Sequence, residues 1–486
     1  MSETSNKPIK AMLRAYQVGF GDCFLLSFEY AGGDKKHILI DFGSTGLPKE
    51  MPEKEKPGWM LRIARDIREQ CKDKNGNSKL HMLVATHRHK DHISGFSMSK
   101  VKGETESTGD IISSLKPDLV IQPWTENPDL SDEDLKQKSD EKMIAKEEFQ
   151  LSPEKNFVAT LHDMHGVAGV ARLEAENSLR TKRRNGFDSV QTLEEKTDKQ
   201  LLFMGDNNLP NESAVMNLRA MAKRRVNGKP AGQYVHFGDK ISLSQLIPGV
   251  KVRVLGPPTI EQHGAIIKQR SRDDNEFWML HSMLKNYWRM QAATAEFTAT
   301  FDETEEMSKN RIFPNARVFQ NFAPSQTRWF INRIRAVRTE QLLGLVRVLD
   351  KAMNNTSVIL MFEVGKKKLL FPGDAQIENW EYALDQPAIL DLLKDTDLYK
   401  VGHHGSRNAT PKTLWRKFAK KNKDENTKDR LLSVNSTMEG KHGHTIQTAV
   451  PRKTLVEELN KFSKYYTTEN ANVEEHKLCQ EIPIEL

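Results

Sequence analysis

The chain has 486 residues, of which 37% are hydrophobic and 29% are charged, so it is long enough for a large core and too apolar for a disordered protein. Lys and Arg exceed Asp and Glu by only 73 to 66, which favours an anionic partner weakly. The longest apolar run, at 358–362, is far shorter than the roughly 20 residues that span a bilayer, so no membrane partner is expected. The N-terminal residues 1–9, predicted to be disordered, lack the apolar core of a signal peptide. Three cysteines far apart in the sequence, Cys23, Cys71 and Cys479, form no disulfide framework, and a cytoplasmic location is therefore expected.

The first part of the chain predicts strands followed by a helix. Residues 10–42 alternate apolar runs with glycine-containing turns, which is typical of an antiparallel meander whose last strand ends at Asp41. Asp41 is either a turn residue or a partner that orients metal-binding histidines. Apolar residues at helical spacing predict a helix at 59–71, and the short apolar runs at 80–85 and 117–124 predict strands.

The segment at 86–92 has the sequence Thr-His-Arg-His-Lys-Asp-His and follows the predicted strand at 80–85 directly. Four of its side chains can bind a metal: His87, His89, Asp91 and His92. Imidazole and carboxylate donors in this spacing suit zinc, with manganese or iron as alternatives. A solvated histidine-rich turn is the simpler interpretation, but the spacing after a buried strand favours a metal site.

Two segments, 126–230 and 259–350, differ from the rest because charged helical sequence dominates them. Their basic runs, such as 180–184 and 223–225, are either solvated helix faces or contacts to a polyanion. Aromatic residues stand among basic residues at 278–330, where a helix core is favoured over stacking on nucleic-acid bases. Between the two segments, 231–258 returns to a pattern that predicts strands.

The last part of the chain predicts a second set of strands and helices. A hairpin at 358–371 ends at Asp374, a helix is expected at 378–393, and the strand at 397–401 ends at the pair His403 and His404. A further strand at 431–434 and a helix at 455–462 follow. Asp374 can bridge two ions, although an aspartate in this position can also cap a helix. Asp206 follows a similar apolar run, but it lies within the charged segment, so Asp374 is the favoured ligand.

Eight short motifs together resemble the ComEC-type domains of the metallo-β-lactamase superfamily. They lie at 18–22, 38–43, 86–92, 238–241, 254–258, 354–357, 372–374 and 401–406. The resemblance covers about half of the chain, and it implies an α/β fold that is a four-layer αββα sandwich. The expected order is a first half of the domain at 10–125, a helical insertion at 126–230, a return to the core sheet at 231–258, a second helical insertion at 259–350 and a second half at 351–486.

The resemblance also implies a set of six metal ligands at strand ends: His87, His89, Asp91, His92, Asp374 and His404. His87 and His89 would bind one ion, Asp91 and His92 the second, and Asp374 would bridge the two. His404 would complete the second site, with His403 as the alternative. The middle histidine of the superfamily has no clear match here, although His236 and His263 lie in the expected region.

The implied activity is two-metal hydrolysis of a phosphodiester, with two divalent ions, zinc before manganese, and a metal-bridging hydroxide as the nucleophile. Asp91 would orient the nucleophile, and His444, or else His403, would protonate the leaving oxygen. Ser406 and Arg407 are either phosphate contacts or ordinary loop residues. The expected substrate is a nucleic acid, DNA before RNA; a small phosphodiester or another ester or lactone is the alternative. The alternative to an enzyme is a binding protein: a metal-stabilised subunit whose helical insertions dock a protein partner in a larger complex, for instance a defence complex.

Overall fold

The structure is a computed structural model that describes residues 7–49, 51, 54, 56–98, 106–130, 158, 211–264, 352–406, 410–441, 449–471 and 477–486. The chain divides into two compact units, one made of 1–159, 207–269 and 350–486 and the other of 160–206 and 270–349. All described residues belong to the first unit. The basic run at 180–184 and the aromatic residues at 278–330 lie outside them.

The first sheet has seven strands in the order β16-β1-β2-β3-β4-β5-β8. Its strands are β1 (Pro8–Tyr16), β2 (Cys23–Tyr30), β3 (Lys35–Phe42), β4 (Met82–Val84), β5 (Leu119–Pro123), β8 (Gly232–Val235) and β16 (Cys479–Ile484). The strands from β16 to β3 pair in antiparallel fashion, and those from β3 to β8 pair in parallel. Parallel strands run in the same direction, so their carboxyl ends meet at one edge of the sheet.

The second sheet also has seven strands, in the order β15-β14-β13-β12-β11-β10-β9. Its strands are β9 (Lys240–Ile241), β10 (Val250–Gly256), β11 (Ile359–Val364), β12 (Lys367–Phe371), β13 (Leu398–Lys400), β14 (Leu432–Asn435) and β15 (Lys464–Thr467). A separate two-stranded ribbon joins β6 (Arg225–Val226) to β7 (Lys229–Pro230). As in the first sheet, one half is antiparallel, from β9 to β12, and the other half, from β12 to β15, is parallel.

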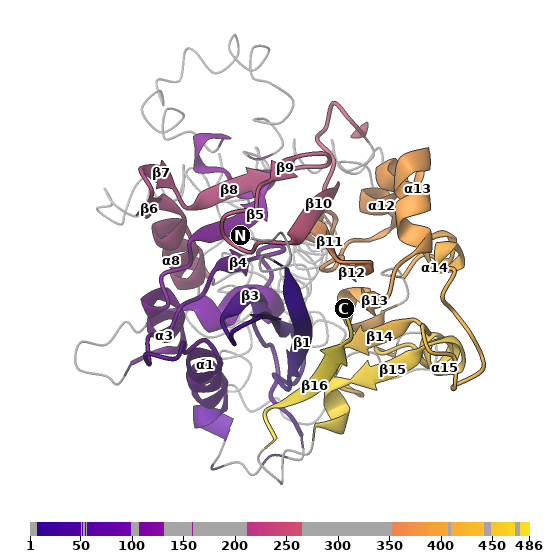
Figure 1. The fold of residues 1–486 in the computed structure, drawn as a ribbon, viewed down its shortest axis with the longest axis horizontal. Helices are drawn as coiled ribbons and strands as arrows, with labels where there is room; N and C mark the ends of the chain where they lie inside the picture. The colour runs from indigo at the N-terminus through magenta and orange to yellow at the C-terminus, as the bar shows by residue number, and fades with distance from the viewer. Residues whose placement is uncertain are drawn as a thin grey trace, which may run out of the picture. The chain divides into compact units, whose positions relative to one another are not determined.

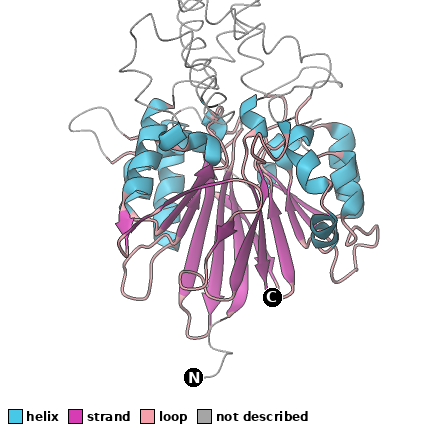
Figure 2. Ribbon diagram, turned by 90° about the horizontal axis from the view of Figure 1, so that it is seen from above, coloured by secondary structure: helices cyan, strands magenta, loops and turns pink. Residues whose placement is uncertain are grey.

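The two sheets pack against each other through one hydrophobic core. It contains the inward-facing residues of both sheets, and the rings of Phe24 in β2 and Phe371 in β12 meet across it with centroids 6.1 Å apart. Alternating inward residues of this kind hold two sheets together and exclude water from between them. Figure 2 shows the strands of both sheets in the middle of the described unit, with helices on the outer sides.

Helices cover the outer face of each sheet. The helices are α1 (Trp59–Gln70), α2 (Lys90–Ile93), α3 (Thr108–Ser114), α8 (Glu212–Lys223), α12 (Ile377–Leu384), α13 (Pro387–Lys394), α14 (Lys412–Lys417) and α15 (Lys453–Phe462), as labelled in part in Figure 1. α1 buries Trp59, Ile63, Ala64 and Ile67, which recur at helical spacing and therefore share one face. This face and those of α3 and α8 pack on the first sheet, whereas α12 to α15 pack on the second. The chain thus has a mixed α/β fold.

Most of the predicted strands and helices are present, with three differences. The single helix expected at 378–393 is wrong: α12 ends at Leu384 and α13 begins at Pro387, because proline cannot donate the hydrogen bond that a continuous helix needs. β15 and β16 were not expected. α8, within the segment expected to be a helical insertion, packs Ala214, Leu218 and Met221 into the core of the first sheet.

Among the described residues, no helix combines the length and the apolar character needed to cross a bilayer.

Candidate metal centre

Five strand ends bring polar side chains to the same place. β3 ends beside Asp41, β4 is followed by His87 to His92, β12 by Asp374, β13 by His404 and β14 by Ser436. All five strands belong to the parallel halves of the two sheets, so these ends lie on the same side. Rigid strands below and short turns above hold the side chains in position.

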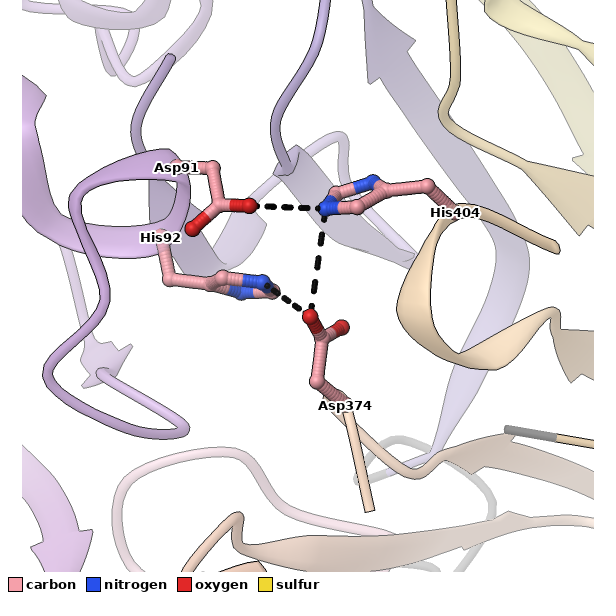
Figure 3. A group of neighbouring side chains, drawn as sticks. All are labelled: Asp91, His92, Asp374 and His404. Carbon is pink, nitrogen blue, oxygen red and sulfur yellow. Dashed lines mark hydrogen bonds and ion pairs between the residues drawn. The ribbon is translucent and has the colours of Figure 1, made fainter. Parts of the chain in front are cut away.

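Asp91, His92, Asp374 and His404 form the centre of this group, as Figure 3 shows. Each offers one donor atom, and the four donor atoms lie within 4.8 Å of one another. His92 Nε2 is 3.0 Å from Asp374 Oδ2, His404 Nε2 is 3.1 Å from Asp91 Oδ2, and His404 Nε2 is 3.8 Å from Asp374 Oδ2. Two carboxylates and two imidazoles therefore point into one small volume from four different segments.

These separations fit a bound divalent cation. Zinc binds nitrogen and oxygen donors at about 2.0–2.2 Å with tetrahedral angles, which places neighbouring donor atoms roughly 3.3–3.5 Å apart. The observed distances of 3.0, 3.1 and 3.8 Å lie on both sides of that value. In addition, His92 Nε2 and Asp374 Oδ2 are buried, and apart from the ion pair between them neither completes a hydrogen bond within the described residues. Buried polar atoms without such partners are expected where a ligand supplies the missing contact.

The outer nitrogens of both imidazoles are held by acceptors. His92 Nδ1 lies 2.8 Å from Asp41 Oδ2, and His404 Nδ1 lies 2.9 Å from the backbone oxygen of Ser436. A histidine that donates a proton from Nδ1 presents Nε2 to the ligand, which is the arrangement usual for metal-binding histidines. Of the two roles expected for Asp41, turn residue or partner of a metal-binding histidine, the structure shows the partner role with His92. Asp41 also accepts hydrogen bonds from the backbone N and the Oγ1 of Thr86, each at 2.7 Å.

Asp374 does not cap a helix. α12 begins at Ile377, with Gln376 in the capping position, and Asp374 is fully buried two residues before Gln376. Its backbone N donates to Ser357 Oγ at 3.2 Å, and its Oδ1 accepts from the backbone N of His403 at 3.1 Å. These contacts leave Oδ2 directed toward His92 and His404.

A buried lysine lies directly beside the centre. Lys400, 1% exposed, forms an ion pair with Asp22 Oδ2, lies 3.6 Å from Asp374 Oδ1, and donates to the backbone oxygen of Gly373 at 3.1 Å. A charge buried in this way must be paired, because its transfer from water is costly. Lys400 therefore compensates part of the negative charge of Asp22 and Asp374. Asp22 also lies close to Asp41 and His92, but this second group is an unsuitable cation site because the ammonium of Lys400 already contacts Asp22.

Charges within the centre shift its acid–base equilibria. Burial by itself raises the pKa values of Asp91 and Asp374, but the neighbouring histidines, including the hydrogen bond between His404 and Asp91, outweigh it and lower both. Burial opposes protonation of His92 and His404, yet Asp374 and the other nearby carboxylates raise the pKa of each. These shifts favour ionised carboxylates beside protonated imidazoles. A divalent cation would replace the imidazole protons on binding.

The turn that holds His404 has an uncommon backbone. His403 (φ 40°, ψ 50°) and His404 (φ 54°, ψ 23°) are both left-handed, a conformation that costs free energy for residues with a Cβ. Asp41, with a φ of 56°, is a third such residue in the same group. Strain of this kind persists where the surrounding contacts determine the conformation, and here all three residues belong to the centre or contact it.

His87 and His89 lie beside the four-residue group rather than in it. His87 Nε2 and His89 Nδ1 are 2.9 Å apart, and the ring of His87 is 4.2 Å from that of His92, centroid to centroid. Burial, reinforced by the charges of His92 and His89, lowers the pKa of His87 well below its usual range. His87 is therefore neutral near pH 7, which is the form that binds metals.

The remaining predicted residues lie elsewhere or cannot be placed. His236 pairs with Asp239 at 3.4 Å and His263 with Glu381 at 3.5 Å, so neither supplies the missing middle histidine. His403 is 28% exposed, with Nε2 4.0 Å from Asp374 Oδ2, and is farther from the centre than His404. Ser406 follows this turn and is largely buried. His444, Arg407 and Asp206 lie outside the described residues.

Sequence reasoning overlooked the roles of Asp22, Lys400 and Ser436. One signal was available for Lys400, because a lysine between apolar residues at the end of a short buried strand requires a partner if it is buried. Asp22 lies within one of the motifs noted above but was not singled out. Ser436 acts through its backbone oxygen, which the side-chain sequence does not reveal.

No protein-family model matches the chain, and no curated protein matches it at a significant level. The functional assignment therefore depends on the sequence motifs and on the geometry of the centre itself.

This arrangement can bind a divalent cation and leave one side of it accessible. The side chain of Asp91 is 14% exposed, whereas those of His92, Asp374 and His404 are at most 1% exposed. A closed structural zinc site has four buried protein ligands, and a catalytic site keeps one position open to water or substrate. Partial exposure at Asp91 is compatible with the second of these arrangements.

Proposed function

We propose that this chain is a metal-dependent hydrolase of the metallo-β-lactamase type that cleaves phosphodiester bonds. The observation that carries the proposal is the convergence of Asp91, His92, Asp374 and His404 at the strand ends of two sheets, with donor atoms within 4.8 Å. The fold supports it, because two packed sheets with helices outside both of them are compatible with the αββα sandwich of that superfamily.

The site is proposed to hold two divalent ions, zinc first and manganese as the alternative. Asp91, His92 and His404 would hold one ion, and His87 and His89 the other, with Asp374 between them. The short distance of 2.9 Å between His87 and His89 supports a shared ligand role for these two imidazoles. When bound, the ions would act as Lewis acids and lower the pKa of a coordinated water.

The protein's own residues would position the reacting groups and balance the charges around them. Asp91, the most exposed member of the centre, would accept a hydrogen bond from the attacking water and orient it toward phosphorus. Asp41 and the backbone oxygen of Ser436 hold the rings of His92 and His404 in place. Lys400 directs Asp374 by contact with Oδ1, so that Oδ2 stays available for the ions. Ser406 Oγ is buried and makes no hydrogen bond within the described residues, so it can donate to a phosphate oxygen. His444 is proposed to protonate the leaving oxygen.

A nucleic acid is the proposed substrate, DNA before RNA. The resemblance to ComEC-type domains supports a phosphodiester over a lactone or β-lactam. A small phosphodiester would use the same chemistry and is included in the experiment below.

The test is hydrolysis by the metal-loaded protein of plasmid, linear and single-stranded DNA, RNA, and a small diester such as bis(p-nitrophenyl) phosphate. Asp91→Ala/His92→Ala removes two members of the centre. His236→Ala/Asp239→Ala removes a histidine–aspartate pair that lies apart from it and is the matched control. The proposal predicts cleavage of at least one substrate by the wild type and the control, and loss in the first variant. Equal product from all three proteins on every substrate would refute it.

A further inference from the structure

A basic surface lies at one end of the second helical layer. Lysine and arginine outnumber aspartate and glutamate at 410–464, and several exposed cations there form no ion pair within the described residues. Three exposed cations, Arg416, Lys423 and Lys461, together with the half-buried Lys421, define the α14–α15 basic surface. Surface cations are usually solvated singly or paired with acids, so an unpaired group of four needs a reason.

Two aromatic rings contact three of these cations. Lys421 Nζ lies 4.9 Å from the centre of the Trp415 ring, and Lys423 Nζ and Lys461 Nζ lie 5.7 and 5.5 Å from that of Phe462. The segment that carries Lys421 and Lys423 is joined to the end of α15, because the backbone N of Asn422 between them donates to the backbone oxygen of Phe462 at 2.9 Å. Cation–π contacts position an ammonium without cancelling its charge, so the surface remains positive. Trp415 itself is only 7% exposed, so it cannot stack on a base.

Three acids in this part of the chain already contact other groups. Asp424 accepts from the backbone N of Asn426 at 3.0 Å, Asp429 pairs with Lys367 at 3.3 Å, and Glu458 accepts from Trp415 Nε1 at 3.0 Å. Burial lowers the pKa of Lys421; the charge of Glu458 raises it, and the charge of Arg416 lowers it to a smaller extent. Within the described residues no carboxylate pairs directly with Arg416, Lys423 or Lys461, so an external anion would supply a partner for them.

The surface is connected to the metal centre through α15. This helix begins where the backbone N of Arg452 donates to the oxygen of Gly405, next to His404, and its last turn carries Lys461. Its 10 residues span about 15 Å at 1.5 Å per residue. Successive phosphates of one duplex strand advance about 3.4 Å along the helix axis, so this distance corresponds to roughly four to five nucleotides measured along the axis.

We propose that the α14–α15 basic surface binds the phosphate backbone of a nucleic acid about four to five nucleotides from the bond that the metal centre cleaves. This inference rests on the proposed phosphodiesterase function and adds a place where a long substrate is held. Binding is independent of base sequence, because the surface offers charge and no exposed stacking ring.

Binding is measured first without catalysis. A labelled DNA duplex of about 30 base pairs is titrated with protein in EDTA at several salt concentrations, by fluorescence anisotropy. The test variant is Arg416→Gln/Lys421→Gln/Lys423→Gln/Lys461→Gln. The matched control removes four exposed cations that lie apart from this surface: Lys10→Gln/Lys35→Gln/Lys251→Gln/Lys366→Gln. We expect the test variant to lose about tenfold or more in affinity and its slope of log affinity against log salt to fall by about 3 to 4, while the control changes little.

Hydrolysis then separates this inference from the proposed function. The test variant should cleave bis(p-nitrophenyl) phosphate at the wild-type rate, and its KM should rise only for DNA that extends beyond about five nucleotides from the cut. Equal loss of DNA affinity in the test and control variants would overturn the inference, even if hydrolysis is normal. Loss of binding to phosphatidylserine vesicles with unchanged DNA binding would overturn it in favour of a membrane surface. If the wild type hydrolyses nothing, the proposed function fails, and the binding experiment still decides whether the surface binds nucleic acid.

Discussion

Lys400 permits a prediction in which stability and metal binding change in opposite directions. Lys400→Met removes the buried ammonium that contacts Asp22 and lies 3.6 Å from Asp374 Oδ1, while keeping a side chain of similar length. At an effective dielectric constant near 20, the attraction over that distance is roughly 4–5 kcal/mol. Breaking a buried ion pair by removing one partner typically costs about 3–5 kcal/mol. We therefore expect the free energy of unfolding in EDTA to fall by about this amount.

Metal binding should respond in the other direction. Without the lysine, the carboxylates at the centre lack one compensating charge, so a divalent ion should stabilise Lys400→Met more than it stabilises the wild type. Urea unfolding with EDTA and with zinc measures both effects. The double variant Lys400→Met/Asp22→Asn, which removes both charges, should recover most of the stability lost in EDTA. If Lys400→Met is as stable as the wild type in EDTA, or if the double variant is no more stable than the single one, the charge-balance explanation is incorrect.

Two further predictions concern other parts of the fold. Burial lowers the pKa of His37 from 6.5 to about 4 and that of His81 from 6.5 to about 3, so the unfolded chain binds more protons than the folded chain below pH 6.5. The contribution of these histidines to the free energy of unfolding should therefore be complete above pH 6.5 and decrease as the pH falls toward 4. His81→Gln should make the urea midpoint depend less on pH over this range. Gly373 and Gly365 have φ values of 56° and 58°, but a Cβ would lie 2.9 Å from Thr86 at Gly373 and would meet nothing within 4 Å at Gly365. Gly373→Ala should cost more stability than Gly365→Ala, which bears only the backbone cost of about 1–2 kcal/mol, and equal losses in thermal unfolding would show that contact with Thr86 is unimportant.

The sequence was most informative where chemistry and local structure coincide. The segment at 86–92 follows an apolar strand and alternates metal ligands with other residues, so its position at a strand end could be predicted. Strand ends likewise predicted Asp374 and the pair His403 and His404, the family resemblance favoured His404, and the structure brings Asp374 and His404 within reach of Asp91 and His92. Strand ends are predictable because apolar runs and turns mark them in the sequence.

The sequence was least informative where distant segments meet. The contact between Lys400 and Asp22 joins a strand of one sheet to the loop before β2 in the other, and no local pattern specifies it. The hydrogen bond from His404 to Ser436 involves a backbone oxygen, which has no sequence signal. The pairing of β16 with β1 likewise joins the two ends of the chain. Such contacts depend on tertiary packing rather than on local propensity.

The central claim is that Asp91, His92, Asp374 and His404 hold a divalent metal. The most direct measurement is the zinc and manganese content of the purified chain after exhaustive dialysis, compared with Asp374→Asn and Asp206→Asn. Both substitutions replace an aspartate that follows an apolar run and a glycine, but only Asp374 lies in the described centre. We expect the wild type and Asp206→Asn to retain stoichiometric metal and Asp374→Asn to lose it. Wild-type metal content in Asp374→Asn, or loss confined to Asp206→Asn, would contradict the claim.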